Sequence, residues 1–299
     1  MISFALDETQ VLLRETAAQV ARERIRPALR ETEDAGAVAE GLVAEVAELG
    51  LATVTLPEAM GGAGLDLVTR CLVEEELAWG DPGVAAALSG PGAGGAVVLE
   101  AGGQEQVARL LGPFGLGEPR FGALAHSDAD ASEPTLSVAV GAGGWRVRGR
   151  KAHVIHGGRA DLLVVTARSE DGSLAAFAVS GGAKGLWASP RRSTVGWRAV
   201  PVVDINLDDV SAERLEGGGE DLQRGFGRLA VTHAARELGC ARACLDYALE
   251  YGQDRTAFGR PIAHFQANAF ILADLATEAH RGGGHVPYRD SVLTRLLQD

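Results

Sequence analysis

Positive charge and cysteine are both scarce in this sequence, and each shortage argues against a class of protein. The 299 residues carry a formal net charge of −12 and contain three cysteines. Such an acidic balance argues against a nucleic-acid-binding surface, and no basic run indicates contact with a membrane surface. Three cysteines cannot form the paired framework of a small secreted domain, which fits a reducing compartment.

Long hydrophobic runs are lacking too. No stretch reaches the length that spans a bilayer, and residues 1–9 hold no cationic segment followed by an apolar one. We therefore expect a cytoplasmic protein without a membrane span. Cys240 and Cys244 lie one helical turn apart, and we expect both to be small buried apolar residues, because no second ligand pair lies nearby to complete a metal site.

The hydrophobic residues that are present amount to 46% of the chain, enough for a large core in one unit or in two to three subdomains. Their periodicity changes along the chain. It is helical over residues 1–117, typical of strands over 118–221, and helical again over 222–299. This order predicts a mixed α and β fold in which a central β domain lies between two helical domains.

Local signals inside these zones mark individual elements. Asp7 and Gln10 have the spacing of a capping box, and they predict a helix that begins after Asp7 and ends at Pro27. Short apolar or alternating runs predict strands at residues 145–148, 162–165, 175–179 and 202–207.

The most informative segment is residues 255–266, which read R-T-A-F-G-R-P-I-A-H-F-Q and join two helical zones. The planar guanidinium of Arg255 matches the geometry of a pyrophosphate. Phe258 could cover the flat face of a cofactor, and Gln266 could bond its polar edge. An ordinary corner between two helices, with a solvated arginine, has the same appearance when taken alone.

This corner resembles the R-x-x-F-G-x-P-I-x-x-F-Q signature of the acyl-CoA dehydrogenase family. Residues 56–65, L-P-E-A-M-G-G-A-G-L, are similar to the family's P-E-x-x-G-G-x-G-L turn, and residues 74–81 to its E-E-L-A-x-x-D helix end. Residues 238–249 resemble its long helix before the corner. The resemblance extends over about residues 4–278. It implies an N-terminal helical domain, a central antiparallel β domain and a C-terminal helical bundle.

The resemblance also implies FAD as cofactor and an acyl-CoA thioester as substrate. In the family a carboxylate base removes the proton α to the thioester, while the flavin accepts a hydride from the β carbon. The β domain contacts the flavin of its own subunit. The corner instead reaches the FAD of a neighbouring subunit, which gives Arg255, Phe258 and Gln266 as the cofactor-binding residues here.

Two β-domain segments depart from the family pattern. The T-E-P-x-A-G-S-D segment corresponds to residues 125–132, A-H-S-D-A-D-A-S, which lack the threonine hydroxyl and place Asp130 where a phosphate should approach. The G-x-K-x-[FW]-I-[TS]-N segment corresponds to residues 149–156, G-R-K-A-H-V-I-H. There His153 replaces an aromatic platform, and Ile155 replaces the hydroxyl beside the flavin N5.

The catalytic base departs as well. One family position for the glutamate falls near Leu229, and the other, in an I-Y-E-G-T segment near the carboxyl end, has no match. Gly282–Gly284 and Arg289–Asp290 resemble motifs upstream of that segment, which implies that a helical pair is missing between Ala279 and Gly282 and that the bundle is shortened. We therefore assign no catalytic residue.

Glu237 is an alternative base, although an Arg236/Glu237 pair on a helix is typical of a solvated face. A metal site built from His126, His153 and His156 is not expected, because a spacing of three on a strand puts two rings on opposite faces.

These departures favour the non-base-bearing subunit of a heteromeric acyl-CoA dehydrogenase, with a second family member as partner and FAD shared at the interface. Such heteromers in the family act on bulky steroid side-chain thioesters. Two alternatives stay open: a self-sufficient homomeric enzyme with a displaced base, and a flavin-free scaffold or acyl-carrier-binding protein.

Overall fold

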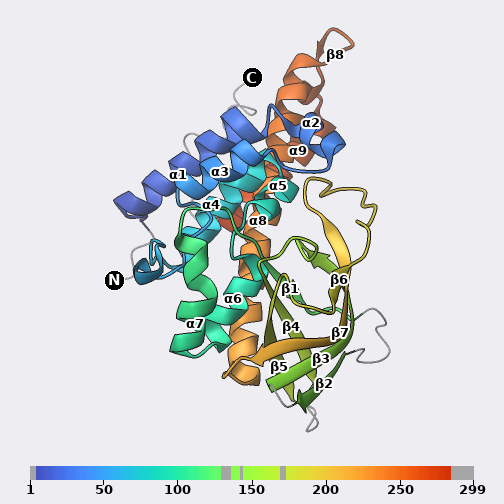
Figure 1. The fold of residues 1–299 in the computed structure, drawn as a ribbon. Helices are drawn as coiled ribbons and strands as arrows, with labels where there is room; N and C mark the ends of the chain where they lie inside the picture. The colour runs from blue at the N-terminus through green and yellow to red at the C-terminus, as the bar shows by residue number, and fades with distance from the viewer. Residues whose placement is uncertain (1–4, 129–135, 142–143, 169–172, 284–299) are drawn as a thin grey trace.

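The computed structural model describes residues 5–128, 136–141, 144–168 and 173–283, so Asp130 and the Arg289–Asp290 pair lie outside the described residues. Figure 1 shows helices from the first third of the chain beside a β-sheet, with one long helix running past both. The N-terminal helices are α1 (Glu8–Val20), α2 (Leu29–Ala35), α3 (Glu40–Glu48), α4 (Leu67–Gly80), α5 (Pro82–Ala87), α6 (Gly92–Ala101) and α7 (Gln104–Leu111), with short 3₁₀ turns at Glu58–Met60 and Gly112–Gly115.

The predicted capping box at the start of α1 is confirmed. Asp7 Oδ1 accepts a hydrogen bond from the Gln10 N–H at 2.8 Å, and Gln10 Oε1 accepts one from the Asp7 N–H at 3.2 Å. The end of the helix differs in detail from the prediction. After Val20 the chain continues as a π-helix over Ala21–Ile25, which ends just before Pro27, where the missing N–H cannot continue the helix.

The sheet contains β1 (Gly122–Ala125), β2 (Leu136–Gly141), β3 (Gly144–Ile155), β4 (Leu162–Arg168), β5 (Leu174–Ser180), β6 (Leu186–Ala188) and β7 (Val202–Arg214). Its strand order is β1-β4-β5-β7-β3-β2, with β6 beside β7. All four predicted strands lie inside β3, β4, β5 and β7. Pairing is antiparallel as expected, except that β1 and β4 run parallel.

Strand β4 shows why the apolar runs form buried strands. Leu163 and Val165 face one hydrophobic cluster inside the β domain, while Leu162 and Val164 face a second cluster against helix α6. Because successive side chains of a strand point to opposite faces, a strand covered on both sides is apolar throughout.

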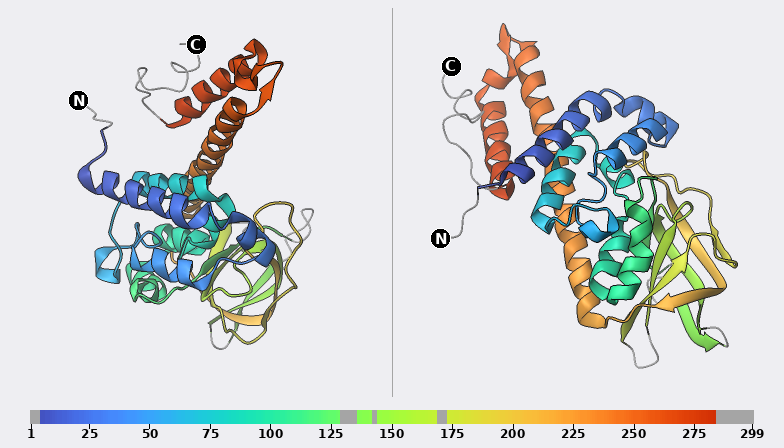
Figure 2. Two further views of the ribbon diagram at one scale, coloured as in Figure 1. Left: turned by 90° about the horizontal axis from the view of Figure 1, so that it is seen from above. Right: turned by 60° about the vertical axis from the view of Figure 1, so that its left-hand side comes forward.

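The last part of the chain is a helical hairpin. Helix α8 (Gly219–Asp254) packs its first half against α4 and α6, and its second half projects from the body beside α9 (Gln266–Gly283), as Figure 2 shows. Large apolar side chains remain exposed on this projection: Tyr247, Tyr251, Phe270, Ile271 and Leu275.

The sequence also led to expectations about the two cysteines of α8 and about membrane spans. Cys240 is half-buried and Cys244 is exposed, so the expectation that both are buried was wrong for Cys244 and only partly met by Cys240. Within the part of the chain that the structure describes, no helix is both long and apolar enough to cross a membrane.

Candidate functional site

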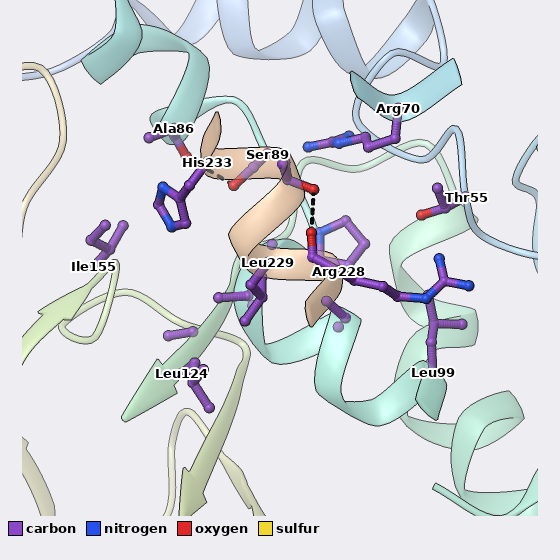
Figure 3. A pocket seen from close by; sticks show the side chains of 18 of the residues that line it. Thr55, Arg70, Ala86, Ser89, Leu99, Leu124, Ile155, Arg228, Leu229 and His233 are labelled. Carbon is purple, nitrogen blue, oxygen red and sulfur yellow. Dashed lines mark hydrogen bonds between the residues drawn. The ribbon is translucent and has the colours of Figure 1, made fainter. Parts of the chain in front are cut away.

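A cavity of about 230 Å³ lies where the N-terminal helices, the sheet and α8 meet. Figure 3 shows its walls. Leu124 of β1 and Ile155 at the end of β3 line the side toward the sheet, whereas Arg70 of α4 and Arg228 of α8 line the opposite side. Leu229 of α8 lies between them. Apolar Leu124 and Ile155 on one side therefore face cationic Arg70 and Arg228 on the other.

Two residues singled out by the sequence do meet in this cavity. Leu229, at one family position for the base, and Ile155, at the position of the lost hydroxyl, both line it. No aspartate or glutamate is among the described residues of its wall. Glu237, the alternative base, is exposed on α8 and does not line the cavity. At Leu229 the wall therefore presents a hydrocarbon side chain and no carboxylate.

The sequence interpretation was wrong for Arg236, which had been assigned to a solvated face. Only 7% of this residue is exposed. Its Nε and Nη2 groups donate to the Glu74 carboxylate of α4, and Arg70 donates to the same carboxylate. Burial by itself would raise the pKa of Glu74, but the charges of Arg236 and Arg70 outweigh it and lower that pKa.

Arg70 has two further acceptors, because its Nη1 donates to the carbonyl oxygens of Leu51 and Ala52 at 3.1 and 3.2 Å. The spacing of Arg70 and Glu74, four apart on one helix face, was a readable signal for part of this cluster. The link to Arg236 was not readable, because 162 positions separate Arg236 from Glu74.

The histidines lie at the sheet end of the cavity. His153 and His156 both have positive φ angles, 56° and 59°, and a bulge between Lys151 and Val154 shifts the β3–β7 register. His156 is buried, Arg159 Nε donates to its Nδ1 at 3.0 Å, and its Nε2 faces the Ala86 carbonyl oxygen. Burial first, and the nearby Arg159 charge second, lower the pKa of His156 to about 3. This ring is therefore neutral, with its proton on Nε2.

His126 has different partners, so the three candidate histidines do not converge. Its Nδ1 lies 2.8 Å from Thr166 Oγ1, and its ring packs against Phe226. Among the described residues, no three His, Cys, Asp or Glu side chains are arranged to hold a metal ion. Beside His126, the buried Lys151 Nζ donates to Asp128 Oδ1 at 2.6 Å.

The corner after α8 forms a small β-hairpin, β8 (Thr256–Ala257) and β9 (Arg260–Pro261), which the sequence did not predict. The backbone carbonyl of Arg255 accepts from the Ile262 N–H at 2.8 Å and closes the corner. Phe258 is 98% exposed and has a φ of 51°.

Arg255, Phe258 and Gln266 are all exposed, and they lie on the corner between the end of α8 and the start of α9. Figures 1 and 2 show this corner at the far end of α8, away from the sheet and from the cavity. The structure therefore separates the three predicted cofactor residues from the chain's own cavity.

Comparison with known proteins agrees with this architecture. Residues 7–118, 114–210 and 216–282 match the N-terminal, middle and C-terminal domains of acyl-CoA dehydrogenases. The benzylmalonyl-CoA dehydrogenase of Aromatoleum aromaticum is 32% identical over 289 residues, which cover 92% of this chain and 76% of that protein. The chain belongs to the acyl-CoA dehydrogenase family. An acyl-CoA dehydrogenase of Bacillus subtilis is 28% identical over 308 residues, covering 96% of this chain and 79% of the relative.

Solved structures of the family superpose on most of this acyl-CoA dehydrogenase-family chain. Butyryl-CoA dehydrogenase from Megasphaera elsdenii gives a TM-score of 0.83 at 26% identity, over 93% of this chain and 77% of that one. Glutaryl-CoA dehydrogenase from Mycobacterium smegmatis also gives 0.83, at 28% identity, over 93% and 74% of the two chains. The predicted fold, a β domain between two helical domains, is confirmed.

Proposed function

We propose that this chain is the non-base-bearing subunit of a heteromeric acyl-CoA dehydrogenase and that it completes the FAD site of a related partner subunit. The observation that carries the proposal is Leu229 in the wall of the cavity, with no carboxylate among the described residues around it. Removal of the proton α to a thioester needs a positioned base, which contributes about 10²–10⁴-fold to the rate. Leucine cannot accept that proton.

The chain's own cavity also fits a flavin poorly. The polar edge of a flavin requires hydrogen-bond donors. On the sheet side of the cavity, Leu124 and Ile155 have no polar side-chain atom, and the two ring nitrogens of the buried His156 already face Arg159 and the Ala86 carbonyl oxygen. The FAD of a complete family enzyme, when bound, supplies the hydride acceptor. We infer that in the complex this FAD lies mainly against the partner subunit.

The corner, unlike the cavity, carries side chains suited to contact FAD. Arg255 offers a planar fork for a pyrophosphate and Gln266 an amide for a polar edge. Phe258 is 98% exposed, although burying such a ring contributes about 2–3 kcal/mol. An exposed ring beside two polar donors at the end of a projecting helix pair supports contact with another chain.

The projecting helices support the same partner. Tyr247 and Tyr251 of α8 are exposed, as are Phe270, Ile271 and Leu275 of α9. Five large exposed apolar side chains on one projecting helix pair are more than single scattered surface residues, and such groups mark interaction sites. We propose that a second acyl-CoA dehydrogenase-family subunit covers these side chains, in the cytoplasm. Bulky acyl groups such as steroid side chains are the proposed substrates of the partner's site.

Purification of the chain alone and with a second family member tests this proposal. We expect the chain alone to be colourless or aggregated, and without turnover of short, long or steroid-derived acyl-CoAs in a dye-coupled assay after addition of FAD. Coexpression should give soluble yellow protein with activity. Turnover by the chain alone would favour the self-sufficient enzyme, and stable, colourless, monodisperse protein would favour the scaffold.

A further inference from the structure

We propose that the cavity of this chain binds acyl-CoA thioesters whose acyl group ends in a second carboxylate, and that Arg70 and Arg236 select for that carboxylate. The inference rests on the proposed function only in that this chain recognises acyl-CoA thioesters. It concerns the chain's own cavity, and it depends neither on the missing base nor on the partner subunit.

The charges around the cavity do not balance. Arg70, Arg228 and Arg236 line it, and no acidic side chain does among the residues described there. Behind the wall, Glu74 accepts from both Arg70 and Arg236. Glu100 pairs with Arg228 and also with Arg224. Arg224 pairs with Asp221 as well. Three carboxylates thus serve four guanidinium groups, and the excess of one positive charge lies at Glu74, which serves both Arg70 and Arg236.

The excess positive charge of the cluster formed by Arg70, Arg236 and Glu74 is significant because the cluster is buried. The side chains of Arg70 and Arg236 are 11% and 9% exposed, and that of Glu74 is 1% exposed. A charge taken out of water is costly unless it is paired, so a second anion at this cluster would be favourable. Guanidinium groups also bind carboxylates with strong, directional hydrogen bonds.

The two neighbouring histidines, His156 and His233, have lowered pKa values, which disfavours additional positive charge beside the cluster. The pKa of His233 is lowered by burial and then by the charge of Arg236. Burial chiefly lowers the pKa of His156, and both Arg159 and Arg236 add to this effect. In both rings the shift disfavours the charged form, and the charge of Arg236 contributes to each shift.

The placement of the charges matches a short acyl chain with a charged end. Figure 3 shows Arg70 and Arg228 across the cavity from Leu124 and Ile155, with Leu229 between them. Methylene groups would contact the leucines and Ile155, and a terminal carboxylate would reach the arginine side. A cavity of about 230 Å³ suits a short acyl group. Pockets for larger ligands are roughly 300–1,000 Å³.

Equilibrium binding tests the inference without any turnover. It uses the soluble full chain or, if the chain alone aggregates, the coexpressed complex, in which the variants described below assign binding to this chain's cavity. Isothermal titration would compare glutaryl-CoA with pentanoyl-CoA, which has the same carbon number but no second carboxylate, and with CoA itself. We expect glutaryl-CoA to bind about tenfold more tightly, or better, than pentanoyl-CoA. CoA should bind more weakly than glutaryl-CoA.

Substitutions test whether Arg70 and Arg236 cause the preference for glutaryl-CoA over pentanoyl-CoA. Arg236→Gln and Arg70→Gln should each reduce it severalfold. The matched control Arg109→Gln, which removes an exposed ion pair with Glu213, should leave it unchanged. If the cavity variants do not fold, the wild-type comparison decides alone.

Several outcomes would overturn the inference. These are equal affinity for glutaryl-CoA and pentanoyl-CoA, a preference that survives both cavity variants, CoA binding as tightly as glutaryl-CoA, and no thioester binding at all. Tight CoA binding would assign the arginines to the phosphates of CoA. Because no step needs a flavin or a base, none of these results bears on whether a partner is required for activity.

Discussion

Arg236 of α8 holds Glu74 of α4 through two hydrogen bonds, from Nε to Oε2 at 2.5 Å and from Nη2 to Oε1 at 3.0 Å. Arg70 donates to the same carboxylate from within α4. All three side chains are nearly buried, so the cluster ties the long helix to the N-terminal domain and also forms the charged side of the cavity.

Glu74→Gln should destabilise the protein strongly. The change leaves two buried guanidinium groups without their carboxylate, and we expect a loss of about 3–5 kcal/mol in the free energy of unfolding. Urea denaturation measures it. The control Glu45→Gln, which breaks an exposed pair with Arg24, should cost less than about 1 kcal/mol. Similar losses in the free energy of unfolding for both variants would show that the buried cluster stabilises the protein no more than an exposed ion pair does.

Gly239→Ala should also destabilise, because α8 crosses α4 at this residue. A Cβ at position 239 would lie 2.1 Å from the backbone oxygen of Glu75. Overpacking of this kind typically costs about 1–3 kcal/mol. Gly227→Ala is the matched control on the same helix, since a Cβ there meets no atom within 4 Å. Alanine at position 227 should raise stability by about 0.5–1 kcal/mol. Thermal or urea unfolding compares the two, and a stabilising Gly239→Ala would refute the close crossing.

Stability should fall on mild acidification because of His156. Its pKa is about 3 in the folded protein and 6.5 as the ordinary value, so the unfolded chain takes up the proton first. The stabilisation is complete above pH 6.5 and is lost as the pH falls toward 3. Linkage gives about 2 kcal/mol lost between pH 7 and pH 5. His156→Gln should flatten that pH dependence of unfolding, whereas His264→Gln, on the exposed corner, should retain it. An unchanged slope in His156→Gln would assign the effect to other groups.

Arg255→Ala should weaken FAD retention by the coexpressed complex. Loss of a charge-assisted contact to a phosphate removes about 1.5–3 kcal/mol, which is roughly ten- to a hundredfold in the FAD dissociation constant. Flavin absorbance after dialysis reports the occupancy. The control is Arg30→Ala, at an exposed arginine on α2, which Figure 2 shows apart from the corner. Equal flavin content in both variants would make Arg255 an ordinary surface residue.

Much of the fold was readable from the sequence, because the interactions that decide it are local. Asp7 and Gln10 form the predicted cap within a single turn, and the apolar run at residues 162–165 becomes the buried strand β4. The corner motif was readable for the same reason, since Arg255, Phe258 and Gln266 are near one another in the chain. Leu229 could be singled out by its position in a family pattern.

Only the tertiary structure decided what surrounds the cavity. Arg236 read as a solvated residue because its partner Glu74 is 162 positions away, and no local pattern reveals whether a distant helix will bury a charge. The same holds for the excess of guanidinium groups, which come from α4 and α8. The sequence determined which elements form and the family to which they belong. Packing of distant helices determined which charges are desolvated, because desolvation depends on everything that surrounds a group in space.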